Sequence, residues 1–388
     1  MATDSRYAFN SADHRYMARA LQLAEQGRYT THPNPRVGCV IVRDGRIVGE
    51  GWHQRAGEPH AEVHALRNAG ELAVGADVYV TLEPCAHFGR TPPCADALIR
   101  AGVRRVVAAM IDPNPQVGGQ GLQRLQAAGI ETAQGLLEAQ ARALNPGFIS
   151  VMQRQRPFVR VKMAMSLDGR TAMASGESVW ITGAAARRDV QFWRAQAGAV
   201  LTGIDTVLMD RPSLNVRLDA VELGICTAVR QPERVILDSR LRLPLDAPLL
   251  KLDGQVRVYT CAGDEAAQQK IEVLRAMGVQ VRQFGAGPES SAVPQLELHE
   301  VMTALHQDGI NEVHVEAGAR LSGGLLEQGL VDELIIYMAP HLMGATARPL
   351  FQLSLDTMQQ RKALDIQDMR AVGQDWRIVA RVKAAGDS

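Results

Sequence analysis

Four residues in the first quarter of the chain have the types and spacing needed for hydrolysis at a metal ion. His60 and Glu62 are separated by one residue in the segment PHAE, and Cys85 follows Pro84, with Cys94 further along. Catalytic zinc sites use three protein ligands such as one imidazole and two thiolates, and leave a fourth position for a water whose pKa falls to about 7. Glu62 lies on a different side of the expected helix start from His60. There it can move protons between that water and a leaving amine without binding the metal.

This pattern matches the H-x-E…P-C-x-x-C signature of zinc nucleobase deaminases, with one departure. Eight residues, AHFGRTPP, separate Cys85 from Cys94, where the signature has two. Two prolines stiffen this longer loop, and Cys94 opens a helix whose N-terminus favours a thiolate. The residues alone also allow a closed structural zinc site formed by His60, His64, Cys85 and Cys94. Such a site has no need for Glu62, so we favour catalysis. The segment HAEVH is not the metalloprotease motif H-E-x-x-H, because its Glu is misplaced.

The elements that would position these residues alternate between helices and strands. A helix capped by Asp13 runs to about residue 27, and a strand, tight turn and strand follow over 37–52. A helix from about 59 to 68 carries His60 and Glu62, and Cys94 opens a helix that ends near 101. Strands at 77–82 and 103–110 and helices at 122–128 and 136–144 complete the pattern. It predicts a partly parallel sheet in a layered α/β domain.

A polar stretch, SVMQRQRP, ends at Pro157, and we place a domain boundary there, between domains at 1–150 and 157–388. The second half repeats the α/β pattern. Its helix at 184–196 has Thr182 as the expected cap, and surface loops are expected at 210–232 and 285–295. Its expected strands lie at 158–165, 199–202, 235–237, 256–260, 279–283, 312–316 and 334–338.

Composition excludes several classes of protein. Among the 388 residues, 42 basic and 42 acidic side chains give zero net charge, which argues against a protein that coats nucleic acid or an anionic membrane. No apolar run approaches the roughly 18 residues of a membrane span. Five Cys argue against a disulfide scaffold, so we expect a cytoplasmic enzyme. Lys is scarce, with 5 against 37 Arg, and the first is Lys162.

A second group of residues suits phosphate binding. Glu316 ends the expected strand VHVE, and Gly318, Gly323 and Gly324 follow it. A strand, glycine-rich turn and helix aim backbone N–H groups and a helix N-terminus at phosphate. The segment is neither a Walker A loop nor G-x-G-x-x-G, so these residues alone also allow a plain helix-capping turn.

The segments HPNPRVGC, GEPHAEVHAL and TLEPCAHFGRTPPCADAL resemble the pyrimidine deaminases of riboflavin biosynthesis. The resemblance covers about residues 13–150, and that family shows the same eight-residue cysteine spacing. It implies a cytidine-deaminase-like three-layer α/β domain with His60, Cys85 and Cys94 as zinc ligands and Glu62 as proton shuttle. The implied reaction is hydrolytic removal of the 2-amino group of 2,5-diamino-6-(5-phosphoribosylamino)pyrimidin-4-one.

Four further residues suit that substrate. His87, Arg90 and Thr91 carry donors for its phosphate, and the Asn34 side chain has both a donor and an acceptor for a pyrimidine edge. The residues alone also allow Arg90 as a solvated loop residue and Asn34 as a turn residue between two prolines.

From Pro157 onward the chain resembles the reductase domain that many bacteria fuse to this deaminase. The matching segments are VKMAMSLDGRTAMASGESVWIT, TGIDTVLMDRPSLNVR, VILDS and VEAGARLSGGLLEQGLVDELIIYMAP. The resemblance implies a dihydrofolate-reductase-like α/β domain that uses NADPH to reduce the ribosyl group of 5-amino-6-(5-phosphoribosylamino)uracil to ribityl.

The same resemblance implies a set of binding residues. Members of the family place NADPH near Ala164, Trp180, Thr206, Asp210, Ser239 and the turn with Gly318, Gly323 and Gly324. They place the substrate near Ser178, Arg194, Leu214, Arg217 and Glu316. We expect Arg194 and Arg217 to bind the ribose phosphate. Lys162 and Glu316 are the polar groups expected near the reacting ribose, although Lys162 alone is also compatible with an exposed strand residue. Arg211 departs from the family, which has Asp or Asn there.

Three other functions compete with a bifunctional enzyme: a deaminase with a noncatalytic oligomerisation domain, a nucleic-acid deaminase, and a noncatalytic zinc-binding module. The zero net charge and the reductase-like second half argue against a nucleic-acid substrate. We therefore expect an enzyme that acts on small phosphoribosyl-pyrimidines. We also expect a homo-oligomer, a dimer or tetramer.

Overall fold

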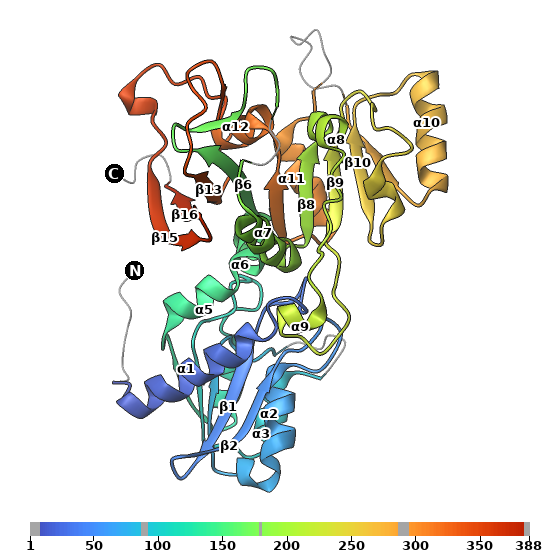
Figure 1. Ribbon diagram of the computed structural model, residues 1–388. Coiled ribbons are helices and arrows are strands. Elements are labelled where there is room, and N and C mark those ends of the chain that lie inside the picture. The colour runs from blue at the N-terminus through green and yellow to red at the C-terminus, as the bar shows by residue number, and fades with distance from the viewer. Residues whose placement is uncertain (1–7, 87–91, 178–180, 286–294, 384–388) are drawn as a thin grey trace. The chain divides into compact units, whose positions relative to one another are not determined.

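The computed structural model describes residues 8–86, 92–177, 181–285 and 295–383 (Figure 1). The chain divides into two compact units. The first comprises Met1–Gln155 with Gly224–Ala228, and the second comprises Arg156–Leu223 with Val229–Ser388. A five-residue segment from the second half of the sequence therefore belongs to the first unit. In the described parts of the chain, no helix is long and apolar enough to cross a membrane.

The first unit is built on a five-stranded sheet in the order β2-β1-β3-β4-β5. The pairs β2–β1 and β1–β3 are antiparallel, and β3–β4 and β4–β5 are parallel, which confirms the predicted partly parallel sheet. The strand bounds are β1 (Gly38–Arg43), β2 (Arg46–Trp52), β3 (Asp77–Val80), β4 (Arg105–Ala108) and β5 (Glu131–Gln134).

Helices cover both faces of this sheet, giving three layers. Gly38 of β1 faces α1, where a Cβ atom would lie 2.0 Å from the Ala20 carbonyl oxygen. Gly51 of β2 pairs with Cys39, the neighbour of Gly38, and so faces the other side. A Cβ atom on Gly51 would lie 2.5 Å from the Ala61 oxygen of α2, so only glycine lets this helix approach. The helices are α1 (Ser11–Glu25), α2 (Ala61–Ala69), α3 (Cys94–Arg100), α4 (Gln120–Ala127), α5 (Glu138–Leu144) and α6 (Pro146–Arg154), with a 3-10 turn η1 (Gly70–Ala73).

The second unit contains a nine-stranded sheet in the order β11-β10-β9-β8-β12-β6-β13-β16-β15. Neighbouring strands from β11 to β13 run parallel, whereas β16 and β15 are antiparallel additions at one edge (Figure 1). The carboxyl ends of β6, β8, β9 and β12 therefore meet at one edge of the sheet. The main strands are β6 (Phe158–Ser166), β8 (Ala199–Gly203), β9 (Glu233–Leu237), β10 (Val256–Thr260), β11 (Gln280–Gln283), β12 (Glu312–Glu316), β13 (Glu333–Ala339), β15 (Leu364–Val372) and β16 (Asp375–Val382).

Helices and short elements complete the second unit. They are α7 (Ala184–Gln196), α8 (Ile204–Asp210), α9 (Ala220–Leu223), α10 (Glu265–Ala276), α11 (Leu298–Gln307) and α12 (Ala319–Glu327), the 3-10 turns η2 (Pro248–Lys251) and η3 (Met358–Gln360), and the strand pair β7 (Arg170–Ala172) and β14 (Arg348–Pro349).

Several local predictions were wrong in detail. Asn10, not Asp13, caps α1, and Asp13 closes a capping box as the third helical residue. Gly183, not Thr182, precedes α7. Part of the stretch predicted as an irregular boundary belongs to α6, which begins at Pro146 and buries the small residues Gly147 and Ser150. The prediction treated residues 149–157 as a polar stretch, although Phe148 and Ile149 of this helix pack against the core of the first unit.

Candidate functional site

The three predicted metal ligands converge in the first unit. His60 is the N-cap residue of α2, Cys94 is the first residue of α3, and Cys85 lies in the segment after β3. The Nδ1 atom of His60 lies 3.3 Å from the Cys94 Sγ and 3.7 Å from the Cys85 Sγ. All three ligand atoms lie within 4.8 Å of one another. Ligands of one tetrahedral Zn²⁺ lie roughly 3.5 Å apart, so this donor set fits zinc.

The surroundings of Cys85 favour a thiolate. The backbone N–H of Cys94 donates to the Cys85 Sγ across 3.3 Å, and Ala95 N–H donates to the Cys85 carbonyl oxygen. A hydrogen bond from the Cys94 side chain, followed by one from the His60 ring, lowers the pKa of Cys85 to about 4. The start of α3 thus stabilises the Cys85 thiolate, and that thiolate, together with burial, raises the pKa of Cys94.

Glu62 lies in the first turn of α2, beside these ligands but outside the ligand group. Its side chain is buried, and burial raises its pKa to about 7. Its Oε2 atom has no hydrogen-bond partner among the described residues. A buried carboxyl group with a free oxygen next to a metal-ligand group is suited to carrying a proton.

His53, which sequence reasoning missed, links Asn34 to the metal-ligand group. Its Nδ1–H donates to the Pro59 carbonyl oxygen across 3.1 Å, because a carbonyl only accepts. Its Nε2 therefore accepts from the Asn34 Nδ2 at 3.0 Å. The His53 and His60 rings meet edge to face with centroids 5.5 Å apart. The side chain of Asn34 is thus oriented near the site.

Glu83 is a second residue that the sequence analysis missed. Its buried carboxylate accepts hydrogen bonds from the backbone N–H groups of Asp112, Gly119 and Gly121 at 3.0, 2.8 and 2.8 Å. Because Glu83 is two residues from Cys85, these bonds fix the segment that carries that ligand. A charged residue inside the apolar run YVTLEPC was the available signal.

The alternative closed site with His64 is not formed, because among the described residues the ligand group contains only His60, Cys85 and Cys94. We therefore expect His64→Ala to keep one zinc ion per chain and to retain ammonia release within about threefold. Metal analysis and an ammonia assay on the same preparation measure both quantities. Loss of zinc from this variant would instead support the structural site with four ligands, His64 included.

In the second unit, a buried charge cluster forms where β12 ends beside the middle of β6. Glu316 of β12 pairs in register with Lys162 of β6. The Arg194 guanidinium of α7 binds both carboxylate oxygens of Glu316, at 2.5 and 2.9 Å. Burial alone would raise the pKa of Glu316, but Arg194 outweighs it and holds that pKa well below its usual value. Burial lowers the pKa of Lys162, although the nearby Glu316 carboxylate acts in the opposite direction and raises it.

The structure distinguishes the two arginines predicted to bind phosphate. Arg194 is buried against Glu316 and also donates to the Asn215 carbonyl oxygen at 3.0 Å. Arg217 is exposed, and its guanidinium has no hydrogen-bond partner among the described residues. Its backbone N–H is held by the Gln191 side chain at 3.0 Å, and Leu214 nearby is buried with a positive φ of 54°. Of these two arginines, Arg217 is the one whose guanidinium is available to a ligand.

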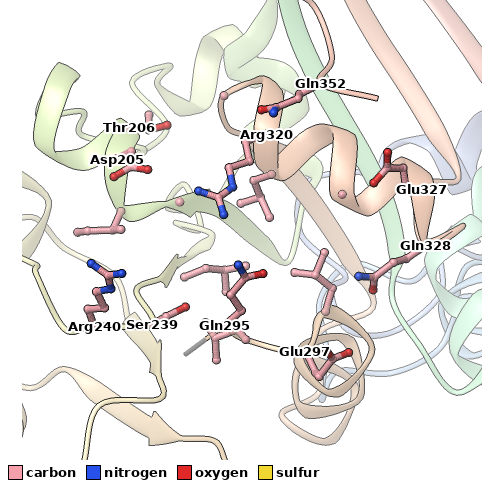
Figure 2. Close-up of a pocket in the computed structure, with 18 of the residues that line it drawn as sticks. Asp205, Thr206, Ser239, Arg240, Gln295, Glu297, Arg320, Glu327, Gln328 and Gln352 are labelled. Carbon is pink, nitrogen blue, oxygen red and sulfur yellow. The ribbon is translucent and has the colours of Figure 1, made fainter. Parts of the chain in front are cut away.

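A cavity of about 700 Å³ opens at the carboxyl ends of β8 and β9 and at the start of α12 (Figure 2). Four of the residues predicted to bind a nicotinamide cofactor line it: Thr206, Ser239, Gly318 and Gly324. Gly318 is the N-cap of α12, and no side chain caps that helix. The cavity thus joins a free helix N-terminus to side-chain hydroxyl groups.

The other predicted cofactor residues are placed differently. Ala164 lies on β6 and the exposed Asp210 ends α8, and neither lines this cavity. Gly323 packs against another segment, because a Cβ atom there would lie 2.1 Å from the Gln352 carbonyl oxygen. Arg211 forms an exposed ion pair with Asp246 at 2.8 Å and also stays outside the cavity. The predicted residues His87, Arg90, Thr91, Ser178 and Trp180 lie outside the described residues.

Both units match known protein families. Residues 10–110 match the model of the cytidine and deoxycytidylate deaminase zinc-binding region, and residues 157–378 match that of the RibD C-terminal domain. Fold and site together define a two-domain enzyme, with a cytidine-deaminase-like zinc-binding domain joined to a dihydrofolate-reductase-like domain. This confirms the predicted fold class.

Full-length relatives specify the family. The riboflavin biosynthesis protein RibD of Escherichia coli is 51% identical over 369 residues, covering 94% of this chain and 97% of its own. RibD of Haemophilus influenzae is 48% identical, covering 95% and 97%. The solved structure of Acinetobacter baumannii RibD, form 1, has a TM-score of 0.86 at 47% identity, covering 96% and 99%. The chain therefore belongs to the RibD family and is a bifunctional deaminase and reductase of riboflavin biosynthesis.

Proposed function

We propose that residues 1–150 hydrolyse the 2-amino group of 2,5-diamino-6-(5-phosphoribosylamino)pyrimidin-4-one, using Zn²⁺. Residues 157–388 then reduce the product, 5-amino-6-(5-phosphoribosylamino)uracil, to 5-amino-6-(5-phosphoribitylamino)uracil, using NADPH. The observation that supports this proposal best is the ligand group of His60, Cys85 and Cys94 with the free, buried Oε2 of Glu62 beside it.

In the deaminase, His60, Cys85 and Cys94 would hold the zinc ion. Zn²⁺, when bound, supplies the Lewis acidity that activates water at neutral pH. Glu62 takes a proton at Oε2 and passes it to the leaving amine, since that oxygen has no competing partner among the described residues. Asn34, held by His53, presents its amide to the pyrimidine edge.

In the reductase, Thr206, Ser239, Gly318 and Gly324 would hold the cofactor, because they line one cavity. NADPH, when bound, supplies the hydride. Arg217 binds the substrate phosphate through its exposed guanidinium, and Lys162 donates to the oxygen of the reacting ribose. Arg194 fixes Glu316 through two hydrogen bonds, so its part is to orient Glu316.

A coupled assay on the purified full-length chain tests these assignments. We expect ammonia release from the diamino-pyrimidine without NADPH, and NADPH oxidation only after deamination or when the deaminated compound is supplied directly. Oxidation of NADPH coupled to reduction of the substrate that still carries its 2-amino group would contradict the proposed order. Ammonia release from cytidine monophosphate at a matching rate would contradict the proposed substrate.

We also infer that the chain forms a homo-oligomer through the edge strand β15. This strand leaves Ile366 and Met369 about 60% and 51% exposed, which is unusual for a sheet edge facing water. Light scattering should give a mass of two or more times the chain mass of 42.1 kDa. The double variant Ile366→Glu, Met369→Glu should shift the protein toward 42.1 kDa at the same concentration. A wild type that is monomeric at micromolar concentration would contradict this inference.

A further inference from the structure

Three arginines that the predicted functions do not use line the same cavity of the second unit. Arg240 and Arg242 follow β9, next to Ser239, and Arg320 lies in the first turn of α12. Figure 2 shows Arg240 and Arg320 directed toward the part of the cavity near Asp205 and Ser239. Segments about 80 residues apart in the chain (240 and 320) thus bring guanidinium groups to one place.

The charges of this cavity are unevenly distributed. Arg242 is neutralised by Asp205, with a nitrogen–oxygen distance of 2.6 Å. The guanidinium groups of Arg240 and Arg320 have no ion-pair or hydrogen-bond partner among the described residues. The acidic residues Glu297 and Glu327 lie on the opposite side of the cavity in Figure 2. One side of the cavity therefore holds two uncompensated positive charges.

Two guanidinium groups without carboxylate partners favour a compact dianion over a neutral hydroxyl group. Apolar side chains also line the cavity, including Ile204, Leu237 and Leu321, and they suit a flat base. The lining therefore fits a nucleoside that carries an additional phosphate monoester. NADPH differs from NADH by such a group, on the 2′-oxygen of its adenosine ribose.

We infer that Arg240 and Arg320 bind the 2′-phosphate of the cofactor's adenosine and so make the reductase specific for NADPH over NADH. This inference rests on the proposed function, which places the cofactor in this cavity. Arg242 is a positioning residue, because its pair with Asp205 removes the negative charge that would repel the phosphate.

Equilibrium binding to the full-length chain tests this without turnover, by calorimetry with 2′,5′-ADP, 5′-AMP, NADPH and NADH. The variants are Arg240→Ala, Arg320→Ala and the double variant, and Arg361→Ala is the matched control. Arg361 is exposed in the same unit and lies outside the cavity. We expect each cavity variant to weaken 2′,5′-ADP and NADPH binding by about tenfold or more, and 5′-AMP and NADH binding by about twofold at most.

The outcomes separate this inference from the proposed function. Equal weakening of NADPH and NADH would overturn it, because the arginines would then bind a part common to both cofactors, such as the pyrophosphate. Unchanged 2′,5′-ADP binding by the double variant would overturn it as well. A wild type that binds neither dinucleotide, while still releasing ammonia, would instead overturn the assignment of the cofactor to this cavity.

Discussion

Glu62→Gln is expected to lower the rate of ammonia release by about 10²- to 10⁴-fold, the usual contribution of a positioned general acid–base group. Glutamine keeps the shape of the side chain but cannot accept and return a proton. Zinc content should stay at one ion per chain, because Glu62 is not in the ligand group of His60, Cys85 and Cys94. Steady-state ammonia release and metal analysis on the same sample measure both effects.

Two comparisons make the Glu62 result specific. Glu71→Gln changes an exposed glutamate of the same unit and should keep the wild-type rate. NADPH oxidation with the deaminated compound should be unchanged in Glu62→Gln, since Glu62 belongs to the first unit and the reductase cavity to the second. Ammonia release within tenfold of wild type would exclude the shuttle role, and loss of both activities would contradict two independent sites.

Lys162→Met is expected to have the largest effect on the reductase, lowering its kcat by about 10²- to 10³-fold. This range is typical for removal of one donor that stabilises developing charge. Met keeps the length of the buried stem. Because Arg194 already binds both oxygens of Glu316, removing the ammonium does not leave that carboxylate unpaired. The fold should therefore survive the substitution.

The measurement for Lys162→Met separates catalysis from binding. Single-turnover oxidation of NADPH with the deaminated compound gives the rate, and calorimetry with NADPH gives the affinity, which should stay within about twofold because Lys162 does not line the cofactor cavity. Lys362→Met, an exposed change in the same unit, is the control. An unchanged kcat, or a loss of NADPH affinity that accounts for the whole effect, would exclude the donor role.

The metal-ligand group was predictable because its signal is local. His60 and Glu62 are fixed by one helix start, and the two cysteines are linked by a short loop whose length matches the family, so the sequence indicated all four residues. His53 was not predictable in this way, since a single histidine in GWHQR has no spacing that points to Asn34 or His60. Only the folded sheet brings the His53 ring into edge-to-face contact with the His60 ring.

The charge cluster of the reductase shows a different limit. Arg194 and Glu316 are 122 residues apart, and a guanidinium binds carboxylate and phosphate with the same fork geometry. Sequence could therefore not decide between an ion pair and a phosphate ligand for Arg194, and the structure shows the ion pair. The strands β15 and β16 were also missed. Most positions of β15 are exposed, so the strand lacks the alternation of buried and exposed side chains on which strand prediction depends.

The segment Gly224–Ala228 has a consequence for how the two activities can be separated. The chain passes from one unit to the other after residues 155, 223 and 228, so the covalent connection between them is threefold. A fragment that stops at residue 155 lacks these five residues of its own unit, and the complementary fragment carries them. The two units are thus not two consecutive stretches of the sequence, and a single cut cannot divide the chain along the boundary between them.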